Sequence, residues 1–400
     1  MEKNEQQMPR LGEPVPAFEA MTTKGKISFP DDYKGKWVIL FSHPADFTPI
    51  CTTEILTFGA RTEEFRALNC ELVGLSVDSR NSHIAWLKTI REKIEYKGMK
   101  DVKVGFPIID DVAMKVASLY GMIQPGESQT AAVRAVFFVD PKGVLRAMIY
   151  YPLAALLQAG IRDILIIIPP GEEGPFYRLL GSGGRFGVNI TYEVQEVARG
   201  IADALLIGSQ FIGDDSVCLV LGDNIFYSPN FQNYLDRAVQ QKSGACVFGY
   251  YVDDPRAFGV VEFDGQGRAI SIEEKPRYPK SNYIIPGLYF YDNSVMEIAR
   301  GLKPSARGEL EITDVNIEYM KRGQLHVEKL DRDFVWLDAG TADNLLESAQ
   351  VVRRVQDETG RYIACPEEIA YARGYISRQT LLRHAADLSK TLYGRYLECL

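Results

Sequence analysis

The sequence predicts a mixed α/β protein made of two consecutive units. Apolar runs of strand length alternate with helical stretches, and this alternation stops and begins again near residue 153. The chain has 400 residues and 46% apolar content, enough for two or three cores. Without a repeat or a low-complexity linker, we expect a polar tail at 1–10, a domain at 11–153 and a second domain at 154–400.

Strand and helix patterns alternate through the first unit, which predicts a small layered domain with a mixed sheet. Its last two strands flank Pro141, Lys142 and Gly143, which favour a turn. The expected elements are a strand at 37–42, a helix at 51–68, a strand at 71–77, a helix at 82–96, a strand at 104–109, a helix at 112–119 and a hairpin of strands 133–140 and 144–151.

The second unit repeats the alternation with different lengths. We expect a helix at 153–159, strands at 163–169 and 188–194, a helix at 201–209, strands at 216–221, 244–252, 259–263, 269–273 and 287–291, and helices at 341–356 and 377–392.

Composition argues against several functional classes. The net charge of -8 and the lack of a lysine and arginine run disfavour nucleic acid and anionic membranes as partners. The first residues are polar, and apolar runs such as 164–170 are too short to span a bilayer, so we expect a cytoplasmic protein. Six scattered cysteines without a Cys-x-x-Cys pair argue against a disulfide scaffold or a zinc site.

Cys51 is the first candidate for chemistry. It follows an apolar strand and falls in the first turn of an expected helix. A helix N-terminus and a nearby cation lower the pKa of a thiol, and the thiolate is the nucleophilic form. The alternative is a buried cysteine that acts as a small hydrophobic residue.

Motifs around Cys51 give the first unit a family resemblance. Pro44, Thr48 and Cys51 form the pattern Pro-x-x-x-Thr-x-x-Cys, supported by segments 77–79, 121–127 and 133–141. This unit resembles a peroxiredoxin, of the type with one essential cysteine and its archaeal relatives. The resemblance implies a thioredoxin-like fold and a thiol-dependent peroxidase that reduces hydrogen peroxide and alkyl hydroperoxides through a cysteine sulfenic acid, without a cofactor.

The same resemblance assigns roles to four residues. Cys51 is the peroxidatic nucleophile, Thr48 hydrogen-bonds the thiolate and the peroxide, and Pro44 covers the sulfur. Arg134 stabilises the thiolate and polarises the O–O bond. His43 lies beside this set, either as a participant or as a histidine packed at the end of a strand.

Reduction of the sulfenic acid needs a second thiol. Cys70 begins an apolar strand and is more simply explained as a core residue than as a resolving cysteine. We therefore expect an external thiol reductant.

The second unit carries a different set of motifs, at residues 221–227, 258–263, 273–276, 287–292, 307–314, 336–341 and 365–370. With these motifs it resembles the sugar-nucleotide pyrophosphorylases, in particular glucose-1-phosphate thymidylyltransferases. The resemblance implies a Rossmann-like fold that converts dTTP and glucose 1-phosphate into dTDP-glucose with Mg²⁺.

By this resemblance, seven residues of the second unit form the binding site. Asp223 and Asp338 hold Mg²⁺, and Gln195 and Gly200 face the base. Glu274 and Lys275 hold the sugar phosphate, while Gly259 adds a backbone contact to the sugar. Any such aspartate taken alone is more often a helix cap or a solvated charge.

The second unit also departs from its family. The glycine-rich loop Gly-Gly-x-Gly-Thr-Arg, whose backbone N–H groups cradle the triphosphate, does not occur in this chain. Segment 181–187 is glycine-rich, but it follows a helix and precedes a strand, the reverse of a phosphate-binding order. Arg146 and Ala147 stand where the family has Lys-Pro. We expect little transferase activity, which leaves a sugar-nucleotide binding module without catalysis as an alternative.

Residues 148–153 are common to both families and mark the junction. They end a strand in the peroxiredoxin pattern and open a helix in the transferase pattern, and one backbone cannot do both. The transferase unit also loses a strand expected at the centre of its sheet, so exposed edges favour a homo-oligomer. Pairing of residues 144–151 with the second sheet and a fusion without an evolved combined function stay open.

Overall fold

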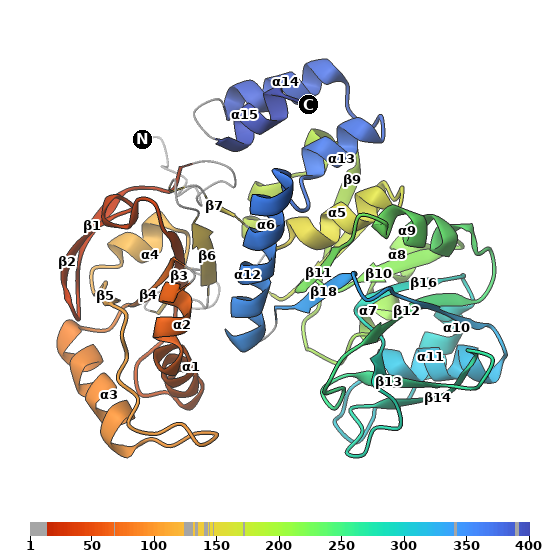
Figure 1. Ribbon diagram of the computed structural model, residues 1–400, viewed down its shortest axis with the longest axis horizontal. Coiled ribbons are helices and arrows are strands. Elements are labelled where there is room, and N and C mark those ends of the chain that lie inside the picture. The colour runs from red at the N-terminus through yellow and green to blue at the C-terminus, as the bar shows by residue number, and fades with distance from the viewer. Residues whose placement is uncertain are drawn as a thin grey trace. The chain divides into compact units, whose positions relative to one another are not determined.

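A computed structural model describes residues 14–67, 69–123, 131–132, 135–139, 143, 145–146, 148–170, 173–339, 342–388 and 392–400. The chain divides into two compact units, whose elements are labelled in Figure 1. The first comprises the described residues of Met1–Ala147, Gly174–Leu179 and Ser377–Leu400, and the second those of Met148–Glu173 and Leu180–Ile376.

The first unit contains a seven-stranded mixed sheet in the order β2-β1-β5-β4-β3-β6-β7. β3 pairs in parallel with β4 and antiparallel with β6, so the strand that leads to Cys51 lies inside the sheet. The strands are β1 (Phe18–Thr22), β2 (Gly25–Phe29), β3 (Trp37–Ser42), β4 (Cys70–Ser76), β5 (Ile108–Asp110), β6 (Ala135–Val139) and β7 (Leu145–Arg146).

Helices pack against this sheet, α2 on β4 and α3 on β5. The helix expected at 51–68 is two helices, because Arg61 ends the first and Thr62 begins the second. The helices of the first unit are α1 (Pro49–Ala60), α2 (Thr62–Ala67), α3 (Arg80–Lys93), α4 (Lys115–Leu119), α6 (Glu173–Leu180), α14 (Arg378–Asp387) and α15 (Leu392–Glu398).

At the junction, the helical form of the shared segment is adopted. β7 ends at Arg146 and pairs with β6, so the alternative in which this segment joins the second sheet is wrong. α5 (Tyr150–Gln158) begins within the shared residues, and its apolar side chains from Pro152 to Leu157 are buried. The strand expected at 144–151 is therefore cut to two residues, because Tyr150 and Tyr151 are helical.

The main sheet of the second unit runs β10-β16-β12-β15-β13-β14, with β17 paired to β12. Its strands are β10 (Val217–Val220), β12 (Ala245–Tyr251), β13 (Gly259–Phe263), β14 (Ala269–Glu274), β15 (Tyr283–Ile284), β16 (Leu288–Tyr291) and β17 (Leu325–Lys329).

Both faces of this sheet are buried, as the continuous apolar runs of its central strands require. Ala245 and Val247 of β12 lie in one core cluster, which includes side chains of α7, α10 and α11, whereas Cys246 and Phe248 lie in another with α5 and α9. The bounds are α7 (Asp203–Ile207), α8 (Ser209–Ile212), α9 (Phe231–Gln240), α10 (Val295–Gly301), α11 (Ile312–Lys321), α12 (Ala342–Thr359) and α13 (Pro366–Ala372).

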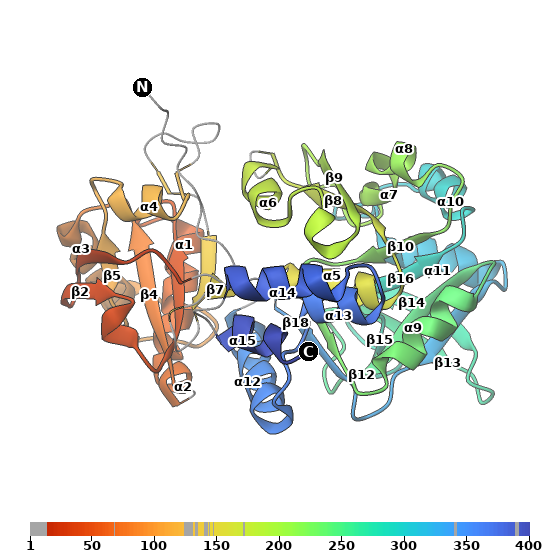
Figure 2. The ribbon, with the colours of Figure 1, turned by 90° about the horizontal axis from the view of Figure 1, so that it is seen from above.

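Two pairs of strands in the second unit stand outside the main sheet. β8 (Asp163–Ile168) and β9 (Asn189–Val194) form a parallel pair, visible in Figure 2, and β11 (Asn224–Tyr227) pairs with β18 (Val335–Asp338). Among the described strands, β8 has β9 as its single partner, and β10 has β16. This interruption agrees with the loss of a central strand expected from the sequence.

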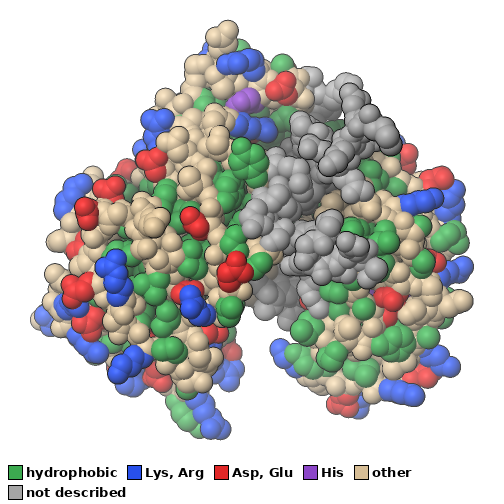
Figure 3. Space-filling view, turned by 180° about the vertical axis from the view of Figure 1, so that it is seen from behind, with side chains coloured by type: hydrophobic (Ala, Val, Ile, Leu, Met, Phe, Trp, Pro, Cys, Tyr) green, Lys and Arg blue, Asp and Glu red, His purple; other side chains and the backbone are tan. Residues whose placement is uncertain are grey.

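Within the described residues, no helix is both long and apolar enough to cross a membrane. On the face drawn in Figure 3, acidic and basic side chains are interspersed among hydrophobic and other groups. This mixed distribution agrees with the negative net charge and the lack of a basic run in the sequence.

Candidate active sites

The thiol of Cys51 lies in the first turn of α1 and is only 1% exposed. Pro49 opens the helix, where its fixed φ is favourable and its missing N–H costs no hydrogen bond. The peptide dipoles of a helix give its N-terminal end partial positive charge, which is a setting found around reactive cysteines. Local geometry thus provides one of the two features that activate a cysteine.

Thr48 is the residue that caps α1 at its N-terminus. Its hydroxyl donates to the carbonyl of Ala45 at 3.1 Å, and its own carbonyl accepts the N–H of Thr52 at 2.9 Å. The hydroxyl therefore has to turn away from Ala45 to donate to a thiolate or a peroxide. Pro44 is half-buried one residue before Ala45, and Arg134 lies outside the described residues.

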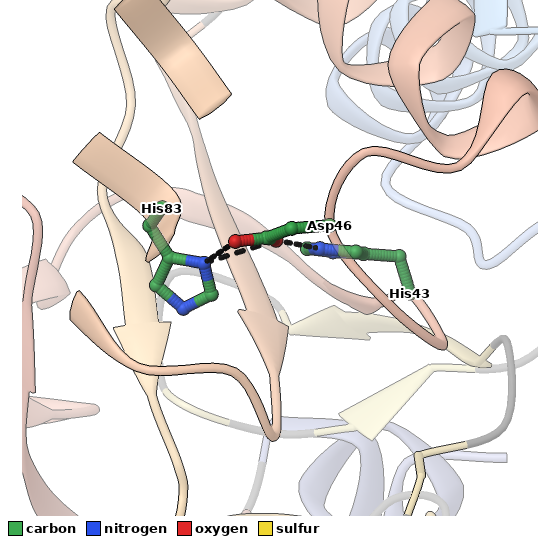
Figure 4. Close-up of side chains that lie close together, drawn as sticks. All are labelled: His43, Asp46 and His83. Carbon is green, nitrogen blue, oxygen red and sulfur yellow. Dashed lines mark hydrogen bonds and ion pairs between the residues drawn. The ribbon is translucent and has the colours of Figure 1, made fainter. Parts of the chain in front are cut away.

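Beside this turn lies a buried group of two histidines and a carboxylate (Figure 4). Asp46 Oδ1 is 2.9 Å from His43 Nε2, and Asp46 Oδ2 is 2.8 Å from His83 Nδ1. Ser82 also donates its hydroxyl to Oδ2 at 2.8 Å. Burial opposes ionisation of Asp46, but the bonds from His43 and His83 outweigh it and lower the pKa of the carboxyl to about 2.

Trp86 connects the histidine group to the helix of Cys51. Its ring lies 5.0 Å from the ring of His43, measured between centroids. Its indole N–H donates to the hydroxyl oxygen of Thr52 at 3.1 Å. Because Thr52 follows Cys51, α3 holds both the first turn of α1 and the histidine group.

The other cysteines differ from Cys51 in their surroundings. All six cysteines are thiols rather than disulfides, and all lie in the described part of the chain. Cys70 is buried at the start of β4, as expected for a core residue. Burial raises the pKa of Cys246 to about 12 and raises that of Cys218 as well, so neither thiol is suited to nucleophilic attack.

In the second unit, three of the sequence motifs meet at the buried side chain of Asn224. Its Oδ1 accepts the N–H of Gly287 at 3.1 Å and the indole N–H of Trp336 at 2.6 Å. Its Nδ2 donates to Asp223 Oδ1 at 2.7 Å. Asn224 therefore holds the carboxylate of Asp223 in position through this hydrogen bond.

The two predicted magnesium ligands lie at adjacent strand ends, with Asp223 directly before β11 and Asp338 at the end of β18. Asp338 pairs with Asn224 across β11 and β18, and the N–H of Ala339 donates to the carbonyl of Asp223 at 2.9 Å. Carboxylate oxygens are the ligands that Mg²⁺ prefers, and the ion usually keeps additional bonds to substrate phosphates and water. The residues fit a magnesium ion held by two carboxylates and a bound phosphate.

The predicted sugar side of the site is organised around Glu274. The hydroxyl of Thr313 donates to Glu274 Oε2 at 2.5 Å, and Arg307 lies 3.5 Å from Oε1. A Cβ at Gly259 would lie 2.9 Å from the hydroxyl oxygen of Thr313 and 3.3 Å from Glu274 Oε2. Lys275 is exposed with a φ of 45°, and its Nζ lies 3.8 Å from Glu274 Oε1.

The two residues expected to face a base are already engaged in the fold. Gln195 donates from its side-chain amide to Asp203 Oδ2 at 2.9 Å. Gly200 has a φ of 100°, and a Cβ there would lie 2.5 Å from the carbonyl oxygen of Leu310. The close approach of Gly200 to Leu310 explains why this position is a glycine, and no bound ligand is needed to explain it.

Several of these residues are not predicted by the sequence motifs. Asp46 lies inside the recognised segment, but nothing in the motif indicated that it would bind His83, 37 positions later. Thr313 and Asn224 lie in the quoted motifs, and their role as supports for Glu274 and Asp223 depends on side-chain direction. A polar residue that is predicted to be buried beside a motif must have a hydrogen-bond partner, and this is the sequence signal for such supporting residues.

Comparisons with known proteins agree with the two-part organisation. The nucleotidyl transferase family matches residues 114–354, and the AhpC/TSA family matches residues 11–148. The two matched ranges overlap just before the junction segment, so both families' patterns are recognised there.

Relatives of known name match the second unit. A glucose-1-phosphate thymidylyltransferase of Mycolicibacterium smegmatis is 52% identical over 252 residues, which are 63% of this chain and 87% of that protein. One from Neisseria meningitidis is also 52% identical over 252 residues, covering 63% of this chain and 88% of the relative.

A crystal structure from Bacillus anthracis, described as a glucose-1-phosphate thymidylyltransferase in complex with sucrose, is 43% identical with a TM-score of 0.48. The match covers 54% of this chain and 84% of that one. Together, the family matches and the curated relatives show that this chain belongs to the nucleotidyl transferase family and carries an AhpC/TSA-type, thioredoxin-like domain at its N-terminal end.

Proposed function

We propose that the chain is a thiol peroxidase whose working site is Cys51. The observation that carries this proposal is the burial of Cys51 in the first turn of α1, directly after the segment that contains Pro44 and Thr48. A thiol held at a helix N-terminus and shielded from bulk water is suited to attack on one peroxide oxygen.

The proposed reaction balances with an external thiol. The Cys51 thiolate attacks the distal oxygen of a hydroperoxide, the O–O bond breaks, and the leaving alkoxide or hydroxide takes up a proton. Cys51 becomes a sulfenic acid. One thiol of the reductant condenses with it to a mixed disulfide and water, and a second thiol releases Cys51 and leaves as the reductant disulfide.

Peroxide consumption in the presence of excess dithiol tests this proposal. We expect the wild-type chain to consume hydrogen peroxide and Cys51→Ser to lose this activity. Cys399→Ser is the matched control, because Cys399 is exposed and is far from Cys51 in the sequence. Equal turnover in Cys51→Ser and wild type would show that another group reduces peroxide.

A second function is favoured by the intact contacts around Glu274. The Thr313 and Arg307 contacts to Glu274, close to the backbone of Gly259, form a group of polar side chains suited to sugar hydroxyls and phosphate. The triphosphate loop of the family does not occur in the sequence, and each missing transition-state donor typically costs a factor of ~10² or more. We therefore propose sugar-nucleotide binding with little or no transfer.

Calorimetry with dTDP-glucose and a pyrophosphate assay with dTTP, glucose 1-phosphate and Mg²⁺ separate these outcomes. Heat of binding without pyrophosphate supports a binding module. Pyrophosphate release that Asp223→Asn abolishes would instead show a working transferase. If neither heat of binding nor pyrophosphate is detected, the second unit neither binds dTDP-glucose nor acts as a transferase.

A further inference from the structure

The hydrogen bonds of the buried histidine group determine which of its nitrogens carry protons. His83 Nε2 lies 3.1 Å from the carbonyl oxygen of Ile109, which can only accept. His83 Nδ1 lies 2.8 Å from Asp46 Oδ2, and an ionised carboxylate can also only accept. Both ring nitrogens of His83 must therefore carry a proton, so His83 is an imidazolium cation paired with Asp46.

His43 reaches the opposite protonation state by the same reasoning. Its Nε2 lies 2.9 Å from Asp46 Oδ1 and must donate. Its Nδ1 is buried and has no hydrogen-bond partner among the described residues. Because one cation already balances Asp46, His43 is neutral, and its bare Nδ1 keeps a lone pair that can accept a proton or a hydrogen bond.

The charges around the group favour this distribution. Asp46 also donates its backbone N–H to Asp78 Oδ2 at 2.8 Å, so a second carboxylate lies close to the pair. Asp110 and Asp111 follow Ile109 at the end of β5. Two histidines facing one carboxylate, with further acidic groups nearby, stabilise one positive charge. The carbonyl oxygen of Ile109, a second acceptor, places this charge on His83.

The unpartnered, buried Nδ1 of His43 destabilises the folded protein, which indicates that this atom has a function. A buried polar atom without a partner has lost its hydrogen bonds to water and gained none in the protein. His43 directly follows β3, and its ring lies against Trp86, which bonds Thr52 beside Cys51. The acceptor thus belongs to the elements that build the thiol site.

We propose that His83 is a positioning residue of the peroxidase: through Asp46, it holds His43 neutral with Nδ1 open to accept a hydrogen bond from an incoming hydroperoxide. This inference rests on the proposed peroxidase function. His83 itself does not touch the substrate, because Asp46 and Ile109 occupy both of its nitrogens.

Long-range ¹H–¹⁵N correlation spectra of the reduced protein test the charge assignment without any activity measurement. The chain contains four histidines, so each ring can be assigned by single replacement. We expect one buried imidazolium, lost in His83→Gln, and one neutral ring protonated at Nε2, lost in His43→Gln. A neutral His83, or a His43 protonated at Nδ1, would overturn the proposal.

The rate of peroxide reaction in single-turnover stopped flow gives the second readout. Without the cation of His83, the Asp46 carboxylate draws a proton onto His43 and closes its Nδ1. We therefore expect His83→Gln to slow the reaction by on the order of tenfold. The spectrum of this variant should show His43 as an imidazolium. An unchanged rate in a folded His83→Gln protein also overturns the proposal.

Two controls separate this inference from the proposed function. His326→Gln is the matched control, because His326 is exposed on β17 in the other unit and should leave rate and spectrum unchanged. If the wild-type protein consumes no peroxide, or if Cys51→Ser keeps the rate, the proposed function fails. That result is visible before any histidine is replaced, and the wild-type spectrum tests the charge assignment even where His83→Gln does not fold.

Discussion

The indole of Trp86 donates a hydrogen bond to the hydroxyl oxygen of Thr52 at 3.1 Å. This bond joins α3 to the first turn of α1, the turn that contains Cys51. Thr52 in turn donates its hydroxyl to the carbonyl of Thr48 at 2.7 Å. The chain of bonds fixes the backbone between the helix cap and the nucleophile.

Replacement of Trp86 by Phe tests how much this bond matters. Phe keeps an aromatic ring against His43 but removes the donor, so we expect a loss of about 1 kcal/mol in the free energy of unfolding. We also expect slower reaction of Cys51 with peroxide, because the first turn of α1 becomes less constrained. Urea unfolding and stopped-flow kinetics check both effects, and a variant with wild-type rate would show that the turn needs no support from α3.

Acid should destabilise the first unit through Asp46. Because the pKa of Asp46 is lowered from 3.8 to about 2 in the folded state, its contribution is complete above its ordinary pKa. The contribution is lost as the pH falls from about 4 towards 2, and it amounts to about 2 kcal/mol.

The measurement is urea unfolding at pH 6 and pH 3 in a Trp336→Phe background, so that fluorescence comes from Trp37 and Trp86 of the first unit. We expect Asp46→Asn to be less stable than its parent at pH 6 and to lose less stability on acidification. Glu19→Gln is the matched control in the same unit. The pKa of Glu19 is also lowered, mainly by a hydrogen bond from Lys26, but this pair is exposed and should contribute little. Equal behaviour of the two variants would contradict the special role of Asp46.

The proposed sugar contacts around Glu274 can be tested by adding a single methyl group at Gly259. In Gly259→Ala, the new Cβ would approach the hydroxyl of Thr313 to 2.9 Å and push on the carboxylate of Glu274. We expect dTDP-glucose binding to weaken by about tenfold, a change of ~1.4 kcal/mol. Calorimetry measures the affinity directly.

Gly265→Ala is the control for this experiment. Gly265 lies in the turn after β13, and a Cβ there meets no atom within 4 Å. Its affinity should match that of the wild type. Equal affinities of Gly259→Ala and wild type would place the sugar elsewhere.

Local spacing in the sequence groups Pro44, Thr48 and Cys51, because they lie on one short segment. His83 comes from α3 and reaches Asp46 only through the packing of α3 beside the sheet, which no local pattern encodes. The partners of Arg134 cannot be compared with the prediction, since Arg134 lies outside the described residues.

The same distinction explains the differences in the fold. The strand at 259–263 was predicted with its observed bounds, because alternation and flanking turns define it locally. β11 was missed, because residues 224–227 form a strand only through pairing with β18, more than 100 positions later. At the junction, Tyr150 could have continued a strand, and burial of the apolar face of α5 in the second unit decided for the helix.

The interrupted sheet of the second unit should be detectable by hydrogen exchange. β12 has partners on both edges, β16 and β17, and its first five residues are buried. Among the described strands, β8 pairs only with β9, and Leu165, Ile166 and Ile167 are half-buried although apolar. Fewer hydrogen bonds and less burial lower the free energy of local opening. We therefore expect amides of β8 to exchange at least ~10-fold faster than those of β12 when mass spectrometry follows peptides from both strands.

Equal protection of β8 and β12 at all protein concentrations would mean that β8 is as firmly held as the central strand. Protection of β8 that rises with protein concentration would instead indicate that a second copy of the chain covers its open edge, as expected for a homo-oligomer.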